Sequence, residues 1–236
     1  MSMNRVLKLR ARKVLREARR ARQAARETWR AQKVARYTRD IVGQEMDAAF
    51  YDRGYREDRA NPQAAYSSAP EDASYYESWK KVLGLIAVDE AIADFGCGSG
   101  QFALMAIAAK KKYIFGMDFS SEAIAWARSR NLSLAHCFHV GDLHDISVYP
   151  KVYDVAVCLE TLEHIENDLF VLSNFRRGCH VVITVPSFAL SVHVRHFKTA
   201  AEVSNRYEGL LNIRSVQKVS VSEYRALWVV DGVRKD

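Results

Sequence analysis

From about residue 85 to the end of the chain, short apolar runs alternate with stretches that have the apolar spacing of helices. Seven runs have the length of strands: AIADFG, YIFGMDF, AHCFHV, YDVAVCL, HVVITVP, RSVQKVSV and RALWVVD. Helical stretches such as QFALMAIAAKK and SEAIAWARSR separate the first five runs, an order that predicts an α/β fold with a mostly parallel sheet and helices on both faces. The last two runs are joined by a short polar link, so we expect an antiparallel pair at one edge.

The first 43 residues have a different pattern, with no Gly or Pro before Gly43 and much Ala, Arg, Leu and Lys, which favour helices. A thin stripe of mostly small apolar residues between Leu7 and Ala25 predicts one long helix that is otherwise covered by arginine. Residues 1–40 contain 14 Lys and Arg against three acidic residues, whereas the whole chain has a formal net charge of +7. This basic arm could bind RNA or another polyanion, lie on an anionic membrane surface, target an organelle, or pack as a solvated helix on the body or on a partner.

Residues 44–84 mix aromatic and charged side chains. Asn61-Pro62 and Pro70 interrupt this segment, and EDASYYESWKKVLGLI has the features of a helix that leads into the body. Its aromatic residues could line a substrate entrance, or they could belong to helix faces packed on the sheet. They are Phe50, Tyr51, Tyr55, Tyr66, Tyr75, Tyr76 and Trp79. We therefore divide the chain into a basic helical arm (1–43), an aromatic-rich cap or entrance segment (44–84) and one α/β domain (85–236).

The composition restricts the class of protein further. The chain has 236 residues, of which 49% are apolar, enough for one substantial core. No apolar run approaches the roughly 20 residues that a membrane-spanning helix needs. The four cysteines, at positions 97, 137, 158 and 179, show no C-x-x-C pair or other metal-ligand spacing. A chain of this size does not need disulfide bonds for stability, so we expect a reducing, cytoplasmic setting.

The most specific signal is the glycine-rich stretch ADFGCGSGQF at residues 93–102, between the first predicted strand and the first predicted helix. Gly96, Gly98 and Gly100 permit a tight turn and a close approach of a ligand to the backbone, and the next helix offers unpaired N–H groups. The dinucleotide pattern G-x-G-x-x-G would need a glycine at position 101, which is Gln101 here. The glycines instead follow the pattern G-x-G-x-G.

Together with Asp94, this loop resembles the first motif of the class I S-adenosylmethionine-dependent methyltransferases, which have a Rossmann-like, doubly wound sheet. The resemblance covers residues 85–236 and implies that S-adenosylmethionine is the cofactor. It implies that Asp94 and the three loop glycines contact the cofactor, and that Asp118, after the second predicted strand, accepts hydrogen bonds from both ribose hydroxyls. The other implied cofactor contacts are Phe119, Asp142 and Leu143 near the adenine, and Leu159. Each aspartate could simply cap a turn, but their places at successive strand ends favour a shared ligand.

After the fourth predicted strand, LETLEHI places Glu160, Glu163 and His164 at spacings that would bring their side chains to one side of a helical turn. ETLEH resembles the E-x-x-E-H motif of the ubiquinone-biosynthesis O-methyltransferases and of the small-RNA 3′-terminal 2′-O-methyltransferases. The resemblance implies that these three residues bind a divalent metal, Mg²⁺ or Mn²⁺, with a further ligand from SVHVRHF, either His193 or His196. Such an ion would lower the pKa of an acceptor hydroxyl.

A metal-free alternative stays open. His164 or His193 could act as a general base, with Glu163 beside them, and the glutamates would then be acids favoured by a helix N-terminus. The candidate catalytic residues are therefore His164, Glu163 and His193, and the candidate metal ligands are Glu160, Glu163, His164 and His196.

The acceptor is less well defined by the sequence. The chain lacks the motifs of amino-directed DNA methyltransferases and of cytosine-C5 enzymes after the fourth strand. Lys198 and Thr199 replace the acidic and aromatic stretch of the RNA enzymes, and Thr199 with Glu202 has the pattern of a helix capping box. We therefore expect O-methylation of a small-molecule or glycan hydroxyl. The basic arm keeps RNA ribose 2′-O-methylation as an alternative, and a third hypothesis is a non-catalytic, cofactor-binding assembly protein.

Overall fold

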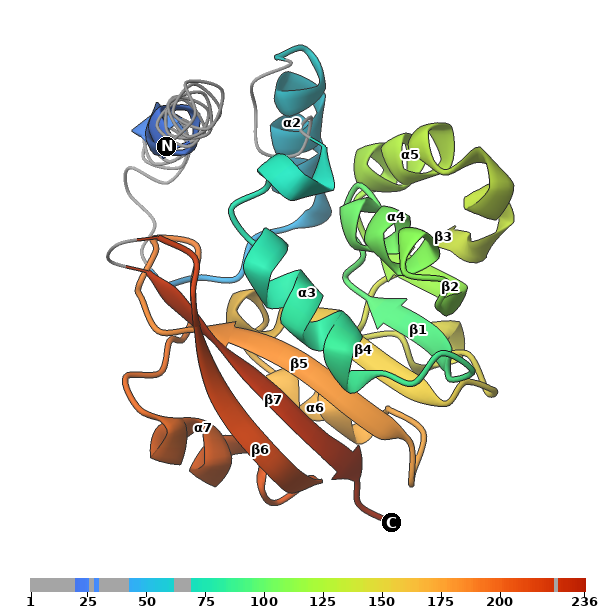
Figure 1. The fold of residues 1–236 in the computed structure, drawn as a ribbon, viewed down its shortest axis with the longest axis vertical. Coiled ribbons are helices and arrows are strands. Elements are labelled where there is room, and N and C mark those ends of the chain that lie inside the picture. The colour runs from blue at the N-terminus through green and yellow to red at the C-terminus, as the bar shows by residue number, and fades with distance from the viewer. Residues whose placement is uncertain (1–19, 26–27, 30–42, 62–68, 223–224) are drawn as a thin grey trace, which may run out of the picture.

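The computed structural model describes residues 20–25, 28–29, 43–61, 69–222 and 225–236. Its centre is a seven-stranded sheet with the order β3-β2-β1-β4-β5-β7-β6 (Figure 1). The strands are β1 (Ala91–Phe95), β2 (Lys112–Asp118), β3 (Phe138–Val140), β4 (Val155–Leu159), β5 (His180–Pro186), β6 (Leu211–Ser220) and β7 (Ala226–Arg234). Strands β1 to β5 pair in parallel, whereas β7 is antiparallel to both β5 and β6. The predicted mostly parallel sheet with an antiparallel edge pair is confirmed.

The burial of the strands follows their place in the sheet. Every residue of β1, β4 and β5 is buried, as expected for central parallel strands with helices on both faces. The edge strand β6 mixes partly buried with exposed positions, among them Arg214 and Lys218. The continuous apolar runs of the sequence therefore mark the centre of the sheet, and the mixed run marks its edge.

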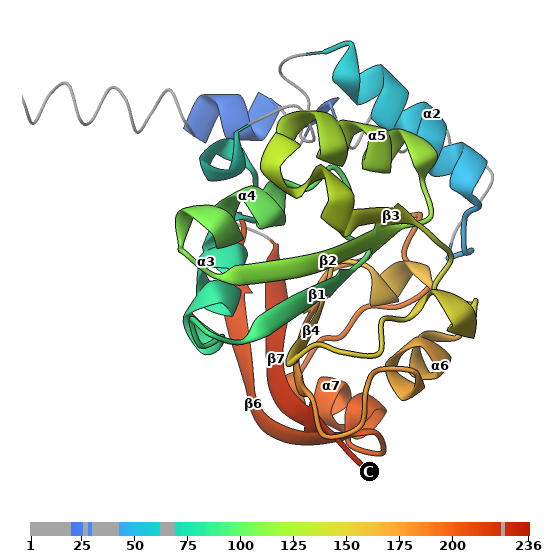
Figure 2. The same cartoon turned by 90° about the vertical axis from the view of Figure 1, so that its right-hand side faces the viewer.

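Helices form a layer on each face of the sheet (Figure 2). One layer holds α3 (Tyr76–Leu85), α4 (Gln101–Ala108) and α5 (Ser121–Arg130), and the other holds α6 (Asp168–Ser173) and α7 (Ala200–Tyr207). On the first side Phe102 of α4 belongs to one buried cluster with Ile92 of β1. On the second side Leu172 of α6 belongs to another with Ile183 of β5. The sheet thus separates two hydrophobic cores.

The predicted start of α7 is confirmed by its hydrogen bonds. The Thr199 hydroxyl accepts from the N–H of Glu202 at 3.2 Å, and the Glu202 carboxylate accepts from the N–H of Lys198 at 2.7 Å. The first bond satisfies an N–H group that the first helical turn leaves unpaired, and the second satisfies the N–H of the residue just before the N-cap.

Helix α2 (Ala48–Arg59) lies outside the two layers and packs against α5. Asp52 joins the two helices, because its carboxylate accepts from the Ser120 hydroxyl at 2.6 Å and from the N–H of Glu122 at 3.2 Å. The N-terminus of α5 favours a negative charge at this place. We keep the name cap segment for residues 43–59, which carry this helix, and not for the whole predicted segment 44–84.

Of the predicted basic helix, residues 20–25 and 28–29 are described, and they are helical. The side chain of Gln23 donates to the carbonyl of Val221 at 2.8 Å, so this part of the arm contacts the turn between β6 and β7. The remainder of the arm, and with it most of the basis for the RNA, membrane and targeting hypotheses, lies outside the described residues. Within the described part of the chain, no helix combines the length and the apolar character needed to cross a membrane.

Candidate functional site

A cavity of about 240 Å³ lies at the carboxyl ends of the parallel strands. Its walls include the ends of β1, β2 and β4, the loops after β3 and β5, and residues of the cap segment. The strand order reverses here, because β2 and β3 lie to one side of β1 while β4 and β5 lie to the other. Open parallel sheets bind their ligands at this kind of position.

The glycine-rich loop forms one wall of the cavity. Gly96 and Gly98 have φ angles of 86° and 53°, in the left-handed region that favours glycine. A Cβ atom on Gly96 would lie 2.2 Å from the Thr161 hydroxyl, and one on Gly98 would lie 2.8 Å from the Tyr55 hydroxyl. Both positions therefore need glycine, because other parts of the wall approach the loop closely. The third predicted glycine, Gly100, begins α4 and packs against the end of α5 instead of lining the cavity.

Two aspartates, the buried Asp94 and the half-buried Asp118, lie at the ends of neighbouring strands. Asp94 accepts from the Tyr113 hydroxyl at 3.1 Å, and Asp118 accepts from the N–H groups of Gly98 and Ser120, both at 2.9 Å. Burial raises the pKa of Asp94 to about 7, and the charge of Asp118 acts in the same direction. Burial also raises the pKa of Asp118 to about 6, although its two backbone hydrogen bonds act against the rise. A cationic ligand would favour the ionised form of both carboxyl groups.

The other residues expected at the cofactor also line the cavity. They are Phe119, Asp142, Leu143 and Leu159. Leu143 and Leu159 are buried, whereas Asp142 is exposed and accepts from the backbone N–H of His144 at 2.9 Å. The structure thus brings every expected cofactor residue except Gly100 to one cavity.

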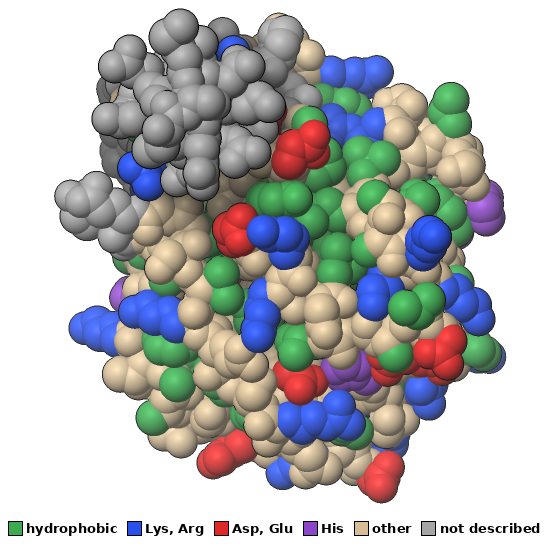
Figure 3. Space-filling model, in the orientation of Figure 1, with side chains coloured by type: hydrophobic (Ala, Val, Ile, Leu, Met, Phe, Trp, Pro, Cys, Tyr) green, Lys and Arg blue, Asp and Glu red, His purple; other side chains and the backbone are tan. Residues whose placement is uncertain are grey.

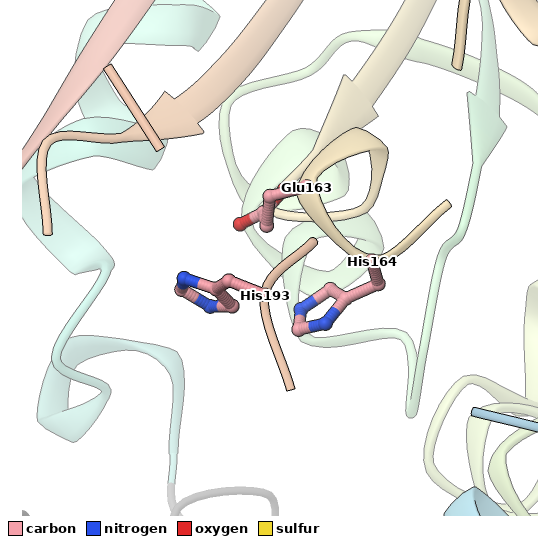
Figure 4. A group of neighbouring side chains, drawn as sticks. All are labelled: Glu163, His164 and His193. Atoms are coloured by element: carbon pink, nitrogen blue, oxygen red, sulfur yellow. The ribbon is translucent and has the colours of Figure 1, made fainter. Parts of the chain in front are cut away.

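Glu163, His164 and His193 converge on one another (Figure 4), and the two histidines line the cavity whereas the buried Glu163 lies behind its wall. One side-chain oxygen or nitrogen of each residue lies within 4.8 Å of the others. Nδ1 of His164 is 3.0 Å from the carbonyl of Val192, and Nδ1 of His193 is 3.2 Å from the carbonyl of Phe188. A carbonyl only accepts hydrogen bonds, so in the neutral rings each Nδ1 carries the hydrogen and each Nε2 keeps a lone pair. The group therefore offers two basic nitrogens beside a buried carboxyl group.

Two of the predicted metal ligands lie outside this group. Glu160 lines the cavity, but it has a φ of 51° and its Oε1 accepts from the Thr184 hydroxyl at 2.9 Å. His196 is exposed on the loop after β5. The expected helical turn is a 3₁₀ turn over Leu162–His164 that begins after Glu160. The α-helical spacing therefore does not apply, and the sequence pattern was wrong about the geometry of this turn.

Arg195 joins the turn after β4 to the loop after β5. Its guanidinium donates to three backbone carbonyls of residues 162–166, and it forms an ion pair with the buried Asp168 at 3.4 Å. The N–H of Val194 adds a bond to the carbonyl of Glu163 at 2.8 Å. In the sequence, only the histidines of this loop indicate a function. The role of Arg195 has no local signal, because its partners lie about 30 positions away in the chain.

Aromatic residues before the sheet also line the cavity: Phe50, Tyr51, Tyr55, Tyr75 and Trp79. The ring of Tyr51 is centred 5.2 Å from that of Phe119 and 6.0 Å from that of His164, so it contacts both sides of the cavity. Trp79 also belongs to the core below α3. The packing interpretation holds for Trp79, and the entrance interpretation stays a prediction for the rings that line the cavity; Tyr66 lies outside the described residues. Glu45, which the sequence did not single out, lines the cavity and accepts from the N–H of Glu166 at 2.7 Å.

Comparisons with known proteins agree with this architecture. Residues 92–180 match the family model described as a methyltransferase domain. Magnesium protoporphyrin IX methyltransferase from Synechocystis, solved with bound S-adenosylmethionine, is 19% identical with a TM-score of 0.60, covering 80% of this chain and 98% of that chain. A putative methyltransferase from Haloferax volcanii, solved in complex with the Trm112 activator, is 17% identical with a TM-score of 0.61, covering 79% of this chain and 98% of that chain.

A third similar structure is named for a reaction other than methyl transfer, a [4+2] cyclisation. The [4+2]-cyclase SpnF is 13% identical with a TM-score of 0.54, covering 68% of this chain and 82% of that chain. Among curated proteins, none matches the chain. At these identities the solved structures show the fold, and the family model adds the domain type. Residues 92–180 of this chain therefore match a methyltransferase domain, and the chain has the fold of the solved methyltransferase that holds S-adenosylmethionine.

Proposed function

We propose that the protein transfers the methyl group of S-adenosylmethionine to a hydroxyl oxygen of a small-molecule or glycan acceptor. The observation that carries this proposal is the pair of imidazoles, His164 and His193, which line the same cavity as the glycine loop. Their Nε2 lone pairs suit an acceptor that must lose a proton. A hydroxyl is such an acceptor, because it is a poor nucleophile until its proton is taken.

The cofactor would occupy the side of the cavity that the strand ends form. Gly96 and Gly98 would let its methionine end approach the backbone, and Asp94 would face its positive charge. Each oxygen of Asp118 accepts one N–H bond and has a second lone pair, which leaves capacity for the ribose hydroxyls. Phe119, Leu143 and Leu159 would supply the apolar surface, with Asp142 at the exposed edge.

The chemical step needs little from the protein beyond position and a base. The acceptor oxygen forms a bond to the methyl carbon while the carbon–sulfur bond breaks and its electron pair stays on sulfur. The hydroxyl proton passes to Nε2 of His164 or His193, whose Nδ1–H is held by a backbone carbonyl. Glu163 would stabilise the imidazolium that forms, since its buried carboxyl group lies in the same cluster.

A divalent ion bound by Glu163, His164 and His193 is a second possibility for the same atoms. The donor set fits, because metal-bound imidazoles are usually oriented by a hydrogen bond from the other ring nitrogen, as both rings are here. Two nitrogens and one carboxylate suit Mn²⁺, Fe²⁺ or Zn²⁺ better than Mg²⁺, which prefers oxygen ligands. When bound, such an ion would lower the pKa of the acceptor hydroxyl.

Calorimetry tests the two parts of the proposal separately. S-adenosylhomocysteine should bind the purified protein, and Asp118→Ala should weaken the binding by roughly tenfold or more because a charge-assisted hydrogen bond is lost. Unchanged affinity in that variant would remove the assigned cofactor site. For the ion, Mn²⁺ should bind the parent chain and the His196→Ala control but not Glu163→Gln. Methyl transfer that survives exhaustive chelation would leave the imidazoles as the base.

A further inference from the structure

The wall of the cavity has an unusual charge for this chain. The chain contains 35 Lys and Arg residues against 28 Asp and Glu residues. Yet among the described residues that line the cavity, six are carboxylic acids and none is Lys or Arg. The six are Glu45, Asp58, Asp94, Asp118, Asp142 and Glu160. Figure 3 shows Lys and Arg side chains scattered over the outer face of the molecule, so the wall differs from the surface around it.

The cofactor accounts for only part of this negative charge. Asp94 lies near the end of β1, Asp118 ends β2 and Asp142 follows β3, on the side proposed for S-adenosylmethionine. Glu160 instead follows β4 and accepts from Thr184 of β5. Glu45 belongs to the cap segment, where it accepts from the N–H of Glu166. The carboxyl groups therefore continue around the side that holds His164 and His193.

The surroundings strengthen the effect of these charges. Phe50, Tyr51 and Trp79 contribute apolar surface to the same walls, and charges that face an enclosed apolar space are screened less than charges in water. The carboxyl groups already oppose one another, since the charge of Asp118 helps to raise the pKa of Asp94. Arg130 donates to Ser99 at 3.4 Å from α5, behind the glycine loop, so its cation lies on the cofactor side.

We propose that the acceptor enters this cavity without a negative charge, as a neutral or cationic hydroxyl compound with an apolar or aromatic part. A phosphate or carboxylate group on the acceptor would face Glu45 and Glu160 with no Lys or Arg among the described wall residues to neutralise it, and with histidines as the only basic side chains there. A hydroxyl or ammonium group would find hydrogen-bond acceptors on every side. This inference rests on the proposed function, because it assigns the acceptor to the wall that carries the two histidines.

An isotope experiment tests the charge of an acceptor that has not been identified. The full chain is incubated with S-adenosylmethionine carrying a deuterated methyl group and a small-molecule extract of the cells that make it. The products are then separated on an anion exchanger and analysed by mass spectrometry. Label in the unretained fraction is the expected result, and label in retained, anionic products overturns the inference. If S-adenosylhomocysteine binds but no product is labelled, the proposed transfer to a small molecule fails. The electrostatic potential of the cavity is then tested by a second measurement, which needs no acceptor.

The second measurement reads the potential of the cavity directly. Cationic and anionic nitroxides of similar size broaden the ring-proton NMR signals of His164 and His193 in proportion to their local concentrations. The measured quantity is the ratio of the broadening by the cationic probe to the broadening by the anionic probe. In the full chain, arm included, this ratio should exceed one severalfold, and Glu160→Gln should lower it. The matched control is Glu208→Gln, which alters an exposed acid outside the wall and should leave the ratio unchanged. A ratio of one or less in the parent chain would overturn the inference.

Discussion

The two sides of the cavity are built in different ways. The side proposed for the cofactor comes from adjacent strand ends and one continuous loop, so the register of the sheet places Asp94, Asp118 and the glycines together. The side proposed for the acceptor is assembled from the turn after β4, the loop after β5 and the cap segment, which includes the bond from Glu166 to Glu45 across 121 positions of sequence. The first arrangement follows from the fold itself. The second depends on a few links that single substitutions can break.

The largest expected effect separates chemistry from cofactor binding. His164→Gln or His193→Gln should lower methyl transfer by about a hundredfold or more, because a general base contributes that much to rate. Affinity for S-adenosylhomocysteine should stay within about twofold, since neither residue lies on the cofactor side. Label transfer into cell extract and calorimetry give the two values. His196→Ala is the matched control, because His196 is exposed and lies outside the cluster; an equal loss in that variant would contradict the assignment.

The next effect concerns the cofactor side. Gly96→Ala should weaken cofactor binding by roughly ten- to hundredfold, because the new methyl group would overlap the Thr161 side chain and shift the loop. Gly178→Ala is the control, since Gly178 has a φ of 71° but no atom within 4 Å of an added Cβ. It should cost about 1–2 kcal/mol of folding stability and no affinity. Similar affinities in the two variants would show that the contact with Thr161 is unimportant.

A smaller effect should follow from removing the link between the two acceptor loops. Arg195→Ala should lower methyl transfer about tenfold by loosening the turn that carries His164. Arg234→Ala removes a guanidinium that donates to the carbonyls of Leu172, Ser173 and Leu210, away from the cavity. Both variants should lose stability, by about 2–3 kcal/mol.

The two arginine variants differ in what they should do to the histidines. NMR of the imidazole nitrogens should show the Nδ1–H form of His164 in the parent chain and in Arg234→Ala, and a mixture of forms in Arg195→Ala. An unchanged His164 signal in Arg195→Ala would mean that Arg195 only stabilises the fold.

The smallest effect is a pH dependence that belongs to the cofactor side. The pKa of Asp94 is raised from 3.8 to about 7 in the folded protein, so folding favours the protonated form. The stability of the empty protein should therefore fall as the pH rises from about 4 to 7. Binding of a cation favours the ionised form, so affinity for S-adenosylmethionine should rise severalfold over the upper part of this range and level off above it. Calorimetry at several pH values should show this rise, and Asp94→Asn should flatten it.

The same contrast explains what could be predicted from the sequence. The positions of the strands along the chain and the residues at their ends follow from local patterns, because an apolar run and the polar residue after it are continuous in the chain. Glu160 shows where this fails: its backbone is left-handed and its carboxylate bonds to Thr184, a partner on another strand. Arg195, Glu45 and Asp52 likewise act through partners far along the chain. Only a folded structure brings such pairs together.

The contact between Tyr55 and the glycine loop has a consequence for helix α2. Tyr55 approaches Gly98 so closely that an added Cβ would lie 2.8 Å from its hydroxyl, and Asp52, one turn earlier, holds the same helix to α5. Tyr55 therefore ties the position of α2 to the shape of the glycine loop, so a ligand that displaces the loop would also be felt by α2.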